Sequence, residues 1–227
     1  MRDFAAEGIA VFEGVFAPDE MAALATLLPE EVAGQRGLLR KIPAVRALAG
    51  DIRLRNLLVA LGSAASQPVR AVFFDKNPAR NWKVPWHQDL TIAVRQRHAV
   101  PGFGPWSIKD GVPHVQPPAA LLDRMVTLRV HLDDCAPENG ALRVRPRSHR
   151  HGRIAESEMP RWDFAPETTC VVRAGGVVAL RPLLLHASSP AQLPRHRRVV
   201  HIEYSPDTLP EPLEWFDSEA AGLEIHR

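Results

Sequence analysis

The chain has 227 residues, 45% of them apolar, and a formal net charge of +2. This length and composition suit one domain built around one substantial hydrophobic core. The near-neutral charge gives no indication of a nucleic-acid partner, and the sequence contains no run of about 18 apolar residues that could cross a membrane.

The first part of the chain, about residues 1–66, is predicted to form a helical support. Residues 9–16 alternate loosely, as in a short strand. Residues 18–28 are expected to form a helix, because proline suits the first turn and two acidic residues follow it near the positive end of the helix dipole. Two more packing helices are expected at 44–49 and 51–61.

From residue 69 onward the sequence changes to short β-like runs separated by Pro, Gly and Asn. About eight such runs suit a mainly β fold, a double-stranded β-helix (a cupin-like jelly roll) with flanking N-terminal α-helices. We expect the whole chain, 1–227, to be one domain whose jelly-roll core covers about 69–204. The predicted strands are 69–74, 86–93, 125–132, 141–144, 170–173, 177–180, 183–186 and 198–204.

A long segment punctuated by Pro and Gly, residues 95–122, interrupts the predicted strands. Irregular loops of this length in compact domains are usually functional or disordered. Because the segment carries Phe103 and Trp106 and follows the His-x-Asp motif described next, we interpret it as a lid whose aromatic side chains contact substrate. A merely solvated loop is the alternative.

A possible metal site is centred on His87 and Asp89, which project from the same face of an extended strand. The best candidate for a third ligand is His186, at the end of a strongly apolar run. Two histidines and one carboxylate on one side of an ion leave the opposite positions open, as in non-haem Fe(II) oxygenases.

A distal arginine, Arg197, adds a group that can hold a carboxylate by a bidentate, charge-assisted pair. With it, the sequence resembles the phytanoyl-CoA dioxygenase family of Fe(II)- and 2-oxoglutarate-dependent oxygenases over roughly residues 69–204. The resemblance rests on Trp86-His87-Gln88-Asp89, Leu132-Asp133-Asp134, Glu138-Asn139-Gly140-Ala141-Leu142, Pro146-Arg147-Ser148-His149 and Leu185-His186-Ala187-Ser188, followed by Arg197.

The resemblance implies an enzyme that uses Fe(II), 2-oxoglutarate and O2 to hydroxylate a small-molecule metabolite, with release of succinate and CO2. It implies that His87, Asp89 and His186 are the iron ligands and that Arg197 and Ser188 bind the C5 carboxylate of 2-oxoglutarate. Related halogenases lack the ligand carboxylate, so its presence here favours hydroxylation or a similar oxidation.

Several further residues are candidate contacts of the bound molecules. Alternation in 125–133 places Thr127 and Arg129 on one face, and if this face looks into the barrel we expect Thr127 to contact the cosubstrate and Arg129 to bind an anionic substrate or the cosubstrate. If the face looks outward, Arg129 is solvated. Lys76 and Gln88 are further candidates for cosubstrate binding. Alternation alone does not decide whether Arg197 or its neighbour Arg198 points inward.

The sequence departs from the family at two turns. The family commonly has Pro-Gly-Ser-His where this chain has Pro146-Arg147-Ser148-His149, and Gly-Asp where it has Gly175-Gly176. We interpret His149 and His151 as turn and surface residues.

Two rival functions remain open from the sequence: a cupin-type metal enzyme that does not use 2-oxoglutarate, and a non-catalytic jelly-roll binding module. The first residues have no apolar segment of signal-peptide length, and Cys135 and Cys170 fit reduced thiols, so we expect a cytoplasmic location. We expect a small-molecule substrate and neither a nucleic acid nor a membrane as partner. The sequence identifies neither the substrate nor the oligomeric state.

Overall fold

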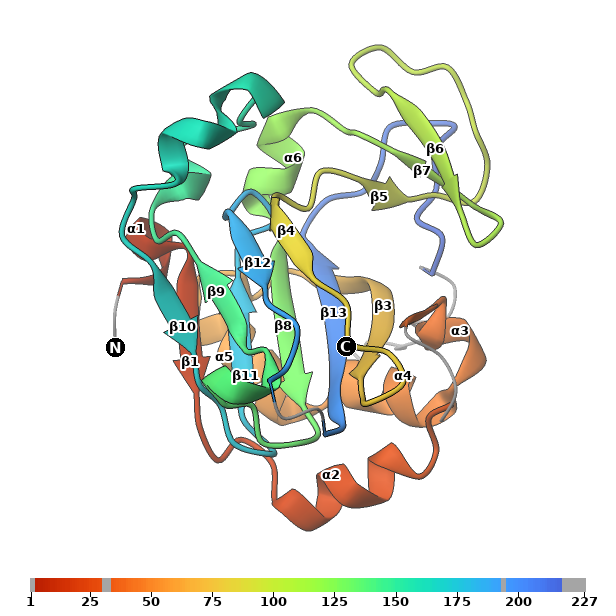
Figure 1. The fold of residues 1–227 in the computed structure, drawn as a ribbon. Helices are drawn as coiled ribbons and strands as arrows, with labels where there is room; N and C mark the ends of the chain where they lie inside the picture. Colours follow the sequence, from red (N-terminus) through yellow and green to blue (C-terminus); the bar gives the residue numbers. More distant parts are fainter. Residues whose placement is uncertain (1–2, 30–33, 193–194, 218–227) are drawn as a thin grey trace.

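Two facing antiparallel sheets and a smaller third sheet form the computed structural model, which describes residues 3–29, 34–192 and 195–217 (Figure 1). The six-stranded sheet has the order β1 (Ile9–Phe12), β11 (Val177–Leu180), β8 (Val126–His131), β13 (Arg197–Ser205), β3 (Gln67–Lys76) and β2 (Gly34–Arg36). The four-stranded sheet has the order β10 (Thr168–Cys170), β9 (Leu142–Val144), β12 (His186–Ser188) and β4 (Val84–His87). The predicted jelly roll is confirmed.

Six α-helices lie among the described residues: α1 (Phe4–Glu7), α2 (Pro18–Ala25), α3 (Leu38–Lys41), α4 (Pro43–Gly50), α5 (Ile52–Ala60) and α6 (Ala119–Arg124). α2 begins at Pro18, as predicted, and the carboxylate of Glu20 accepts a hydrogen bond from the backbone N–H of Ala17 over 2.8 Å. No helix in the described part of the chain is long and apolar enough to cross a membrane.

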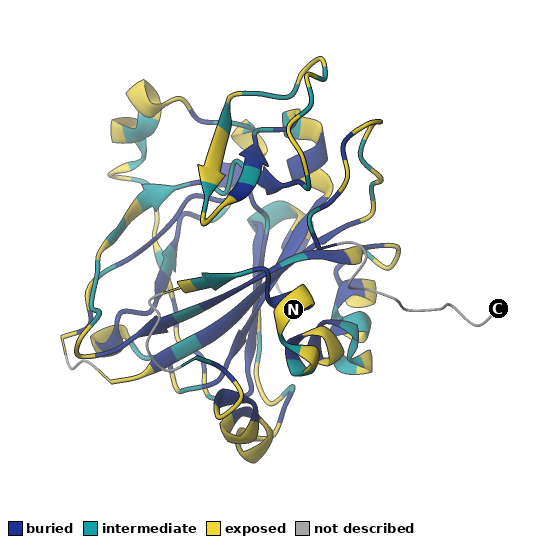
Figure 2. Cartoon of the chain, turned by 90° about the vertical axis from the view of Figure 1, so that its right-hand side faces the viewer, coloured by how far each residue is buried: buried dark blue, intermediate teal, exposed yellow. Residues whose placement is uncertain are grey.

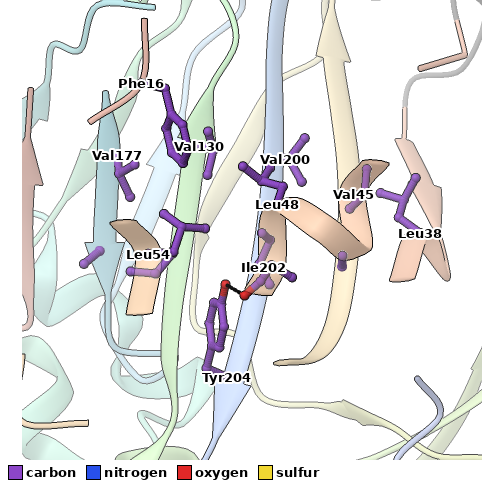
Figure 3. Packing of buried hydrophobic residues seen from close by; sticks show 14 of the residues in the cluster. Phe16, Leu38, Val45, Leu48, Leu54, Val130, Val177, Val200, Ile202 and Tyr204 are labelled. Carbon is purple, nitrogen blue, oxygen red and sulfur yellow. Dashed lines mark hydrogen bonds between the residues drawn. The ribbon is translucent and has the colours of Figure 1, made fainter. Parts of the chain in front are cut away.

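The N-terminal helices cover the outer face of the six-stranded sheet (Figure 3). Leu54 of α5 and Leu48 of α4 pack in one apolar cluster with Val200 and Ile202 of β13. Tyr204 continues this row, and its buried hydroxyl donates a hydrogen bond to the backbone carbonyl of Ala49 over 3.0 Å. Figure 2 shows that burial is concentrated in the strands, whereas the helices turn exposed faces outward.

The opposite, inner face of the six-stranded sheet looks toward the four-stranded sheet. Side chains alternate along a strand, so the residues of β13 between the helix-facing ones point inward. These inward residues include Arg197, His201 and Glu203, and on β8 the same alternation directs Thr127 and Arg129 inward. The sequence had left the direction of this face of β8 open.

Several predicted strands have different bounds in the structure; β10, for example, covers Thr168–Cys170 where 170–173 was predicted. The run 86–93 is not one strand, because β4 ends at His87 and β5 (Ile92–Ala93) is a separate short strand. The backbone N–H of Asp89 donates to the carbonyl of Pro182 over 2.9 Å, outside any ladder. The run 183–186 is also corrected, since β12 begins only at His186.

The segment 95–122 is not an irregular loop. It forms a hairpin of β6 (Trp106–Lys109) and β7 (Val112–Val115), and β7 also pairs with β5 to make the third sheet. The turn is Asp110-Gly111, and both residues have positive φ, 50° and 76°. This backbone conformation is the one that a two-residue hairpin turn requires.

Candidate active site

His87 and His186 lie directly opposite each other on the neighbouring antiparallel strands β4 and β12. Their ring centroids are 4.1 Å apart. Strand pairing therefore brings together two imidazoles that are 99 residues apart in the sequence, and the short β12 holds His186 between β4 and β9.

Each of the two imidazoles has a fixed orientation. The Nδ1 atom of His87 lies 2.9 Å from the carbonyl of Pro85, and the Nδ1 atom of His186 lies 2.9 Å from the carbonyl of Leu184. A carbonyl only accepts, so both rings carry their proton on Nδ1 and present the Nε2 lone pair. Burial lowers the pKa of His186 to about 4, which keeps this ring neutral.

Asp89 completes the cluster. Its Oδ1 lies 3.9 Å from Nε2 of His87 and its Oδ2 lies 3.6 Å from Nε2 of His186. Burial alone would raise the pKa of Asp89, but the nearby His186, His201 and His87, with Arg70, outweigh it and hold the pKa below its usual range. The carboxylate is therefore ionised.

The three donor atoms suit a divalent transition metal. The ligand atoms of His87, Asp89 and His186 all lie within 4.8 Å of one another, and Oδ2 of Asp89 is buried without a hydrogen-bond partner among the described residues. An ionised carboxylate and two imidazoles, each held by a carbonyl on its other nitrogen, form the arrangement by which proteins bind Fe(II).

A second group of polar side chains lies beside His186. Arg197 of β13 and Lys76 of β3 are cross-strand neighbours, and both are almost fully buried, with 4% and 1% exposed. The ammonium group of Lys76 donates to Oγ of Ser188 over 2.9 Å and to the carbonyl of Ser189 over 2.8 Å. Burial, with the charges of Arg197 and Arg129, lowers the pKa of Lys76 to about 7.

The structure separates the two adjacent arginines. Arg198 lies on the helix-facing side of β13, where its guanidinium forms an ion pair with Asp133, with Nη2 2.7 Å from Oδ1. Arg197 points inward, donates to the carbonyl of Gly140, and keeps a buried Nε without a partner among the described residues. Only Arg197 therefore faces the space between the sheets.

A buried network that the sequence did not predict crosses the inner face. Arg129 donates to Nδ1 of His201 over 3.0 Å, Nε2 of His201 lies 3.4 Å from Oε1 of Glu203, and Arg70 pairs with the same oxygen over 2.9 Å. The sequence signal that could have predicted this network is that Arg197, His201 and Glu203 lie on one face of the same strand. Polar residues at every second position usually indicate a solvent-facing side, and here they indicate a polar interior.

The surroundings of Thr127 and Gln88, two predicted cosubstrate contacts, differ from those of Arg197. Thr127 lies opposite Glu203, six residues along β13 from Arg197 and thus roughly 20 Å away by the rise of a strand. The amide of Gln88 is bonded to the backbone: Nε2 donates to the carbonyls of Gly152 and Leu183, and Oε1 accepts from Ile154 N–H. Gln88 thus fastens the ligand strand to a neighbouring turn.

The two aromatic residues predicted to contact substrate lie in an apolar cluster. Phe103 and Trp106 pack against buried residues that include Ile92, Val115 and Met125. Trp106 lies on the hydrophobic side of the third sheet, and Leu90, the residue after Asp89, packs against the same cluster.

The turn that departs from the family pattern has a structural role. Arg147 has a φ of 71°, a conformation that favours glycine, and its guanidinium forms an ion pair with Glu7 over 2.7 Å. Oγ of Ser148 accepts from the N–H of Leu185 over 2.8 Å, so the turn supports the approach to His186. His149 lies in the turn as predicted but is buried, with Nε2 3.1 Å from the carbonyl of Ala5.

The second departure, Gly175-Gly176, is explained by lack of space. A Cβ at Gly176 would lie 2.5 Å from Cγ1 of Val172, closer than the atoms can approach, and 3.1 Å from a carboxylate oxygen of Glu13. The aspartate common in the family would therefore clash here and face a like charge.

Solved structures share this fold over most of the chain. AviO1 from Streptomyces viridochromogenes Tue57 is 24% identical, with a TM-score of 0.66, and the match covers 92% of this chain and 94% of that one. HygX from Streptomyces hygroscopicus with iron bound is 19% identical, with a TM-score of 0.67 and coverage of 92% and 86%. EctD from S. alaskensis is 20% identical, with a TM-score of 0.66 and coverage of 92% and 78%. These identities establish similarity of fold.

No curated protein matches the sequence. The family model described as "Phytanoyl-CoA dioxygenase (PhyH)" matches residues 4–199, which is most of the chain. The match confirms the predicted family, the enzyme class and the predicted set of cofactors. The chain belongs to the phytanoyl-CoA dioxygenase family, whose enzymes use Fe(II), 2-oxoglutarate and O2.

Proposed function

We propose that this enzyme hydroxylates a small-molecule metabolite, with 2-oxoglutarate as cosubstrate and with release of succinate and CO2. The observation that carries the proposal is a group of three buried basic side chains, Arg197, Lys76 and Arg129, on the inner face of the six-stranded sheet. None of the three has a carboxylate within 4.0 Å among the described residues.

Buried cations without an anion are strongly unfavourable, because burial removes their hydration and nothing replaces it. A 2-oxoglutarate dianion supplies the missing negative charge. The structures of HygX with iron bound and with nickel and 2-oxoglutarate bound support the same ligand set through the shared fold.

In this proposal His87, Asp89 and His186 hold the metal, and Arg197 holds the C5 carboxylate of 2-oxoglutarate. The hydroxyl oxygen of Ser188 accepts a hydrogen bond from Lys76, so its own proton is free to be donated to that carboxylate. Lys76 therefore acts both through its charge and by orienting Ser188.

When bound, Fe(II) and 2-oxoglutarate supply the activation of O2 that inserts oxygen into a substrate C–H bond. The chain's own residues fix the coordination geometry, bind the cosubstrate and exclude water from the inner face. The proposal includes a cytoplasmic location, which is supported by the buried free thiols of Cys135 and Cys170.

An anaerobic titration tests the proposal. Metal-free protein is titrated with Fe(II) and then with 2-oxoglutarate, and the weak visible charge-transfer band of a chelated 2-oxo acid is recorded. We expect a saturable band in the wild type and in Arg198→Ala, and a requirement for at least about tenfold more 2-oxoglutarate in Arg197→Ala, because a charge-assisted pair is lost.

Arg198→Ala is the matched control, since it removes an adjacent guanidinium that faces away from the inner surface. Fe(II) binding without a band would overturn the use of 2-oxoglutarate and favour a cupin-type enzyme. An equal effect of the two substitutions on 2-oxoglutarate binding would contradict the role of Arg197 in binding the C5 carboxylate.

A further inference from the structure

The third sheet has two chemically different faces. Trp106 pairs with Val115, and both belong to the apolar cluster on one face. Side chains alternate and directly paired residues share a face, so Lys109 and His114 lie together on the other face. Neither residue belongs to the proposed metal site or to the proposed 2-oxoglutarate site.

This polar face contacts the segment that follows the ligands of β4, since Lys109 donates a hydrogen bond to Thr91, two residues after Asp89. Burial and the charges of Arg70 and Arg36 lower the pKa of Lys109, while the carboxylates of Asp89 and Glu203 act in the opposite direction. The charges of Arg70 and Lys109 also lower the pKa of His114. The ammonium group is therefore near an iron ligand and near the end of β13 that is remote from Arg197.

Lys109 has unused hydrogen-bonding capacity. Its Nζ donates to Oγ1 of Thr91 over 3.0 Å, and Thr91 lies two residues after Asp89. An ammonium group has three protons to donate, and among the described residues no carboxylate lies within 4.0 Å of this one. A half-buried cation in this state is stabilised by an anion on a bound molecule.

His114 offers the complementary group. It is fully buried, and Nδ1 lies 2.9 Å from the carbonyl of Val112, so Nδ1 carries the proton. Nε2 is left as a buried acceptor without a partner among the described residues. Burial lowers the pKa of His114 to about 4, so the ring is neutral and the lone pair is available.

We propose that Lys109 and His114 form a substrate subsite for small hydroxylated molecules that carry an anionic group. The ammonium of Lys109 binds the anion, and Nε2 of His114 accepts a hydrogen bond from a hydroxyl group. The inference deepens the proposed function and rests on it, because the molecule that this subsite binds would be the substrate of the proposed reaction.

Two other substrate classes fit this face less well. A cationic molecule would meet the ammonium group of Lys109, because Arg70 and Arg36 are already paired with Glu203 and Asp110 and Lys109 has no such partner among the described residues. A purely apolar molecule would remove water from the ammonium group and leave Nε2 of His114 without a partner, which is unfavourable for both groups.

The test compares three probes of one length: gluconate, which is anionic, sorbitol, which is neutral, and glucamine, which is cationic. Binding to the anaerobic Fe(II) enzyme is measured by calorimetry at saturating 2-oxoglutarate, so that no probe can occupy the Arg197 site. We expect gluconate to bind at least about tenfold more tightly than the other two.

Two substitutions separate the two contacts. Lys109→Met should abolish the preference for gluconate, and Lys83→Met, which removes an exposed lysine, should retain it. His114→Leu should weaken the binding of all three probes by a similar factor, since all three carry hydroxyl groups, and should leave the preference for gluconate unchanged. Because His114 is buried, its variant is first checked by thermal unfolding, and Lys109→Met decides the proposal independently of it.

Equal binding of the three probes, a preference for glucamine, no binding of any probe, or an unchanged preference in Lys109→Met would each overturn the inference. The 2-oxoglutarate band is recorded first on the same samples. A missing band marks failure of the proposed function, whereas a normal band without anion preference marks failure of the subsite alone.

Discussion

Arg129 and His201 are joined across β8 and β13 by a contact of 3.0 Å between Nη1 and Nδ1. A guanidinium can only donate, so Nδ1 of His201 accepts and the imidazole proton lies on Nε2, toward Glu203. The network from Arg129 to Arg70 therefore has a defined direction, and Glu203 is the carboxylate at its centre.

Glu203→Gln should destabilise the fold, because it leaves Arg70, whose side chain is 13% exposed, without its anion. We expect the free energy of unfolding to fall by about 3 kcal/mol, measured by urea denaturation. Glu158→Gln is the control: its pair with Arg161 is exposed, and its loss should change stability by less than about 0.5 kcal/mol. Similar losses in the two variants would show that the Arg70–Glu203 pair contributes no more to the free energy of unfolding than an exposed pair does.

His186→Ala should abolish stable iron binding. Substitution of a group that merely supports a ligand lowers metal affinity roughly 10- to 100-fold, so loss of the ligand itself should exceed about 100-fold. Iron content after anaerobic loading and desalting measures the effect. The exposed His151 gives the matched control, and His151→Ala should keep full iron content. Full occupancy in His186→Ala would contradict the assignment of the three ligands.

Acid should destabilise the metal-free protein through its buried histidines. Burial lowers the pKa of His114 and of His186 from the ordinary 6.5 to about 4. Between these values the unfolded chain takes up protons that the folded chain does not, so stability is present above pH 6.5 and is lost as the pH falls toward 4.

The slope of this loss should reach about 1.4 kcal/mol per pH unit for each of the two residues. Urea denaturation at several pH values measures it, and His114→Leu should reduce the slope by up to the contribution of one histidine. A pH profile unchanged by that substitution would show that His114 already titrates normally in the folded state.

Leu54→Ala should destabilise the fold by about 3 kcal/mol, because it opens a cavity between α5 and the six-stranded sheet. Ile52→Ala lies two residues earlier on the same helix, with Ile52 69% exposed, and should cost less than about 1 kcal/mol. Thermal and chemical unfolding of the two variants give the comparison. Equal losses would indicate that the helices do not pack on the sheet as described.

Local patterns in the sequence were sufficient for much of the fold. The strand 177–180 has the predicted bounds, and the helices near 18, 44 and 51 exist because proline, acidic residues and apolar periodicity act within a few residues of one another. The His-x-Asp motif and the distal histidine predicted a cluster whose atoms the fold brings within 4.8 Å.

Long-range pairing limited the rest. The carbonyl of Pro182 accepts a hydrogen bond from the N–H of Asp89, and β4 ends at His87. No local sequence pattern predicts this contact. The hairpin in 95–122 was missed although Asp110-Gly111 is a strong turn signal, because nearby prolines suggested an irregular loop. The choice between Arg197 and Arg198 depended on which side of β13 the helices cover.

Arg147 occupies a glycine position of the family while keeping the glycine-like backbone, with a φ of 71° and an ion pair to Glu7. A left-handed conformation costs a non-glycine residue about 1 kcal/mol, and the contacts to Glu7 offset that strain. The family pattern at this position thus specifies a backbone conformation, which more than one residue type can adopt. A motif definition that demands glycine there would fail to detect chains that, like this one, meet the requirement with another residue.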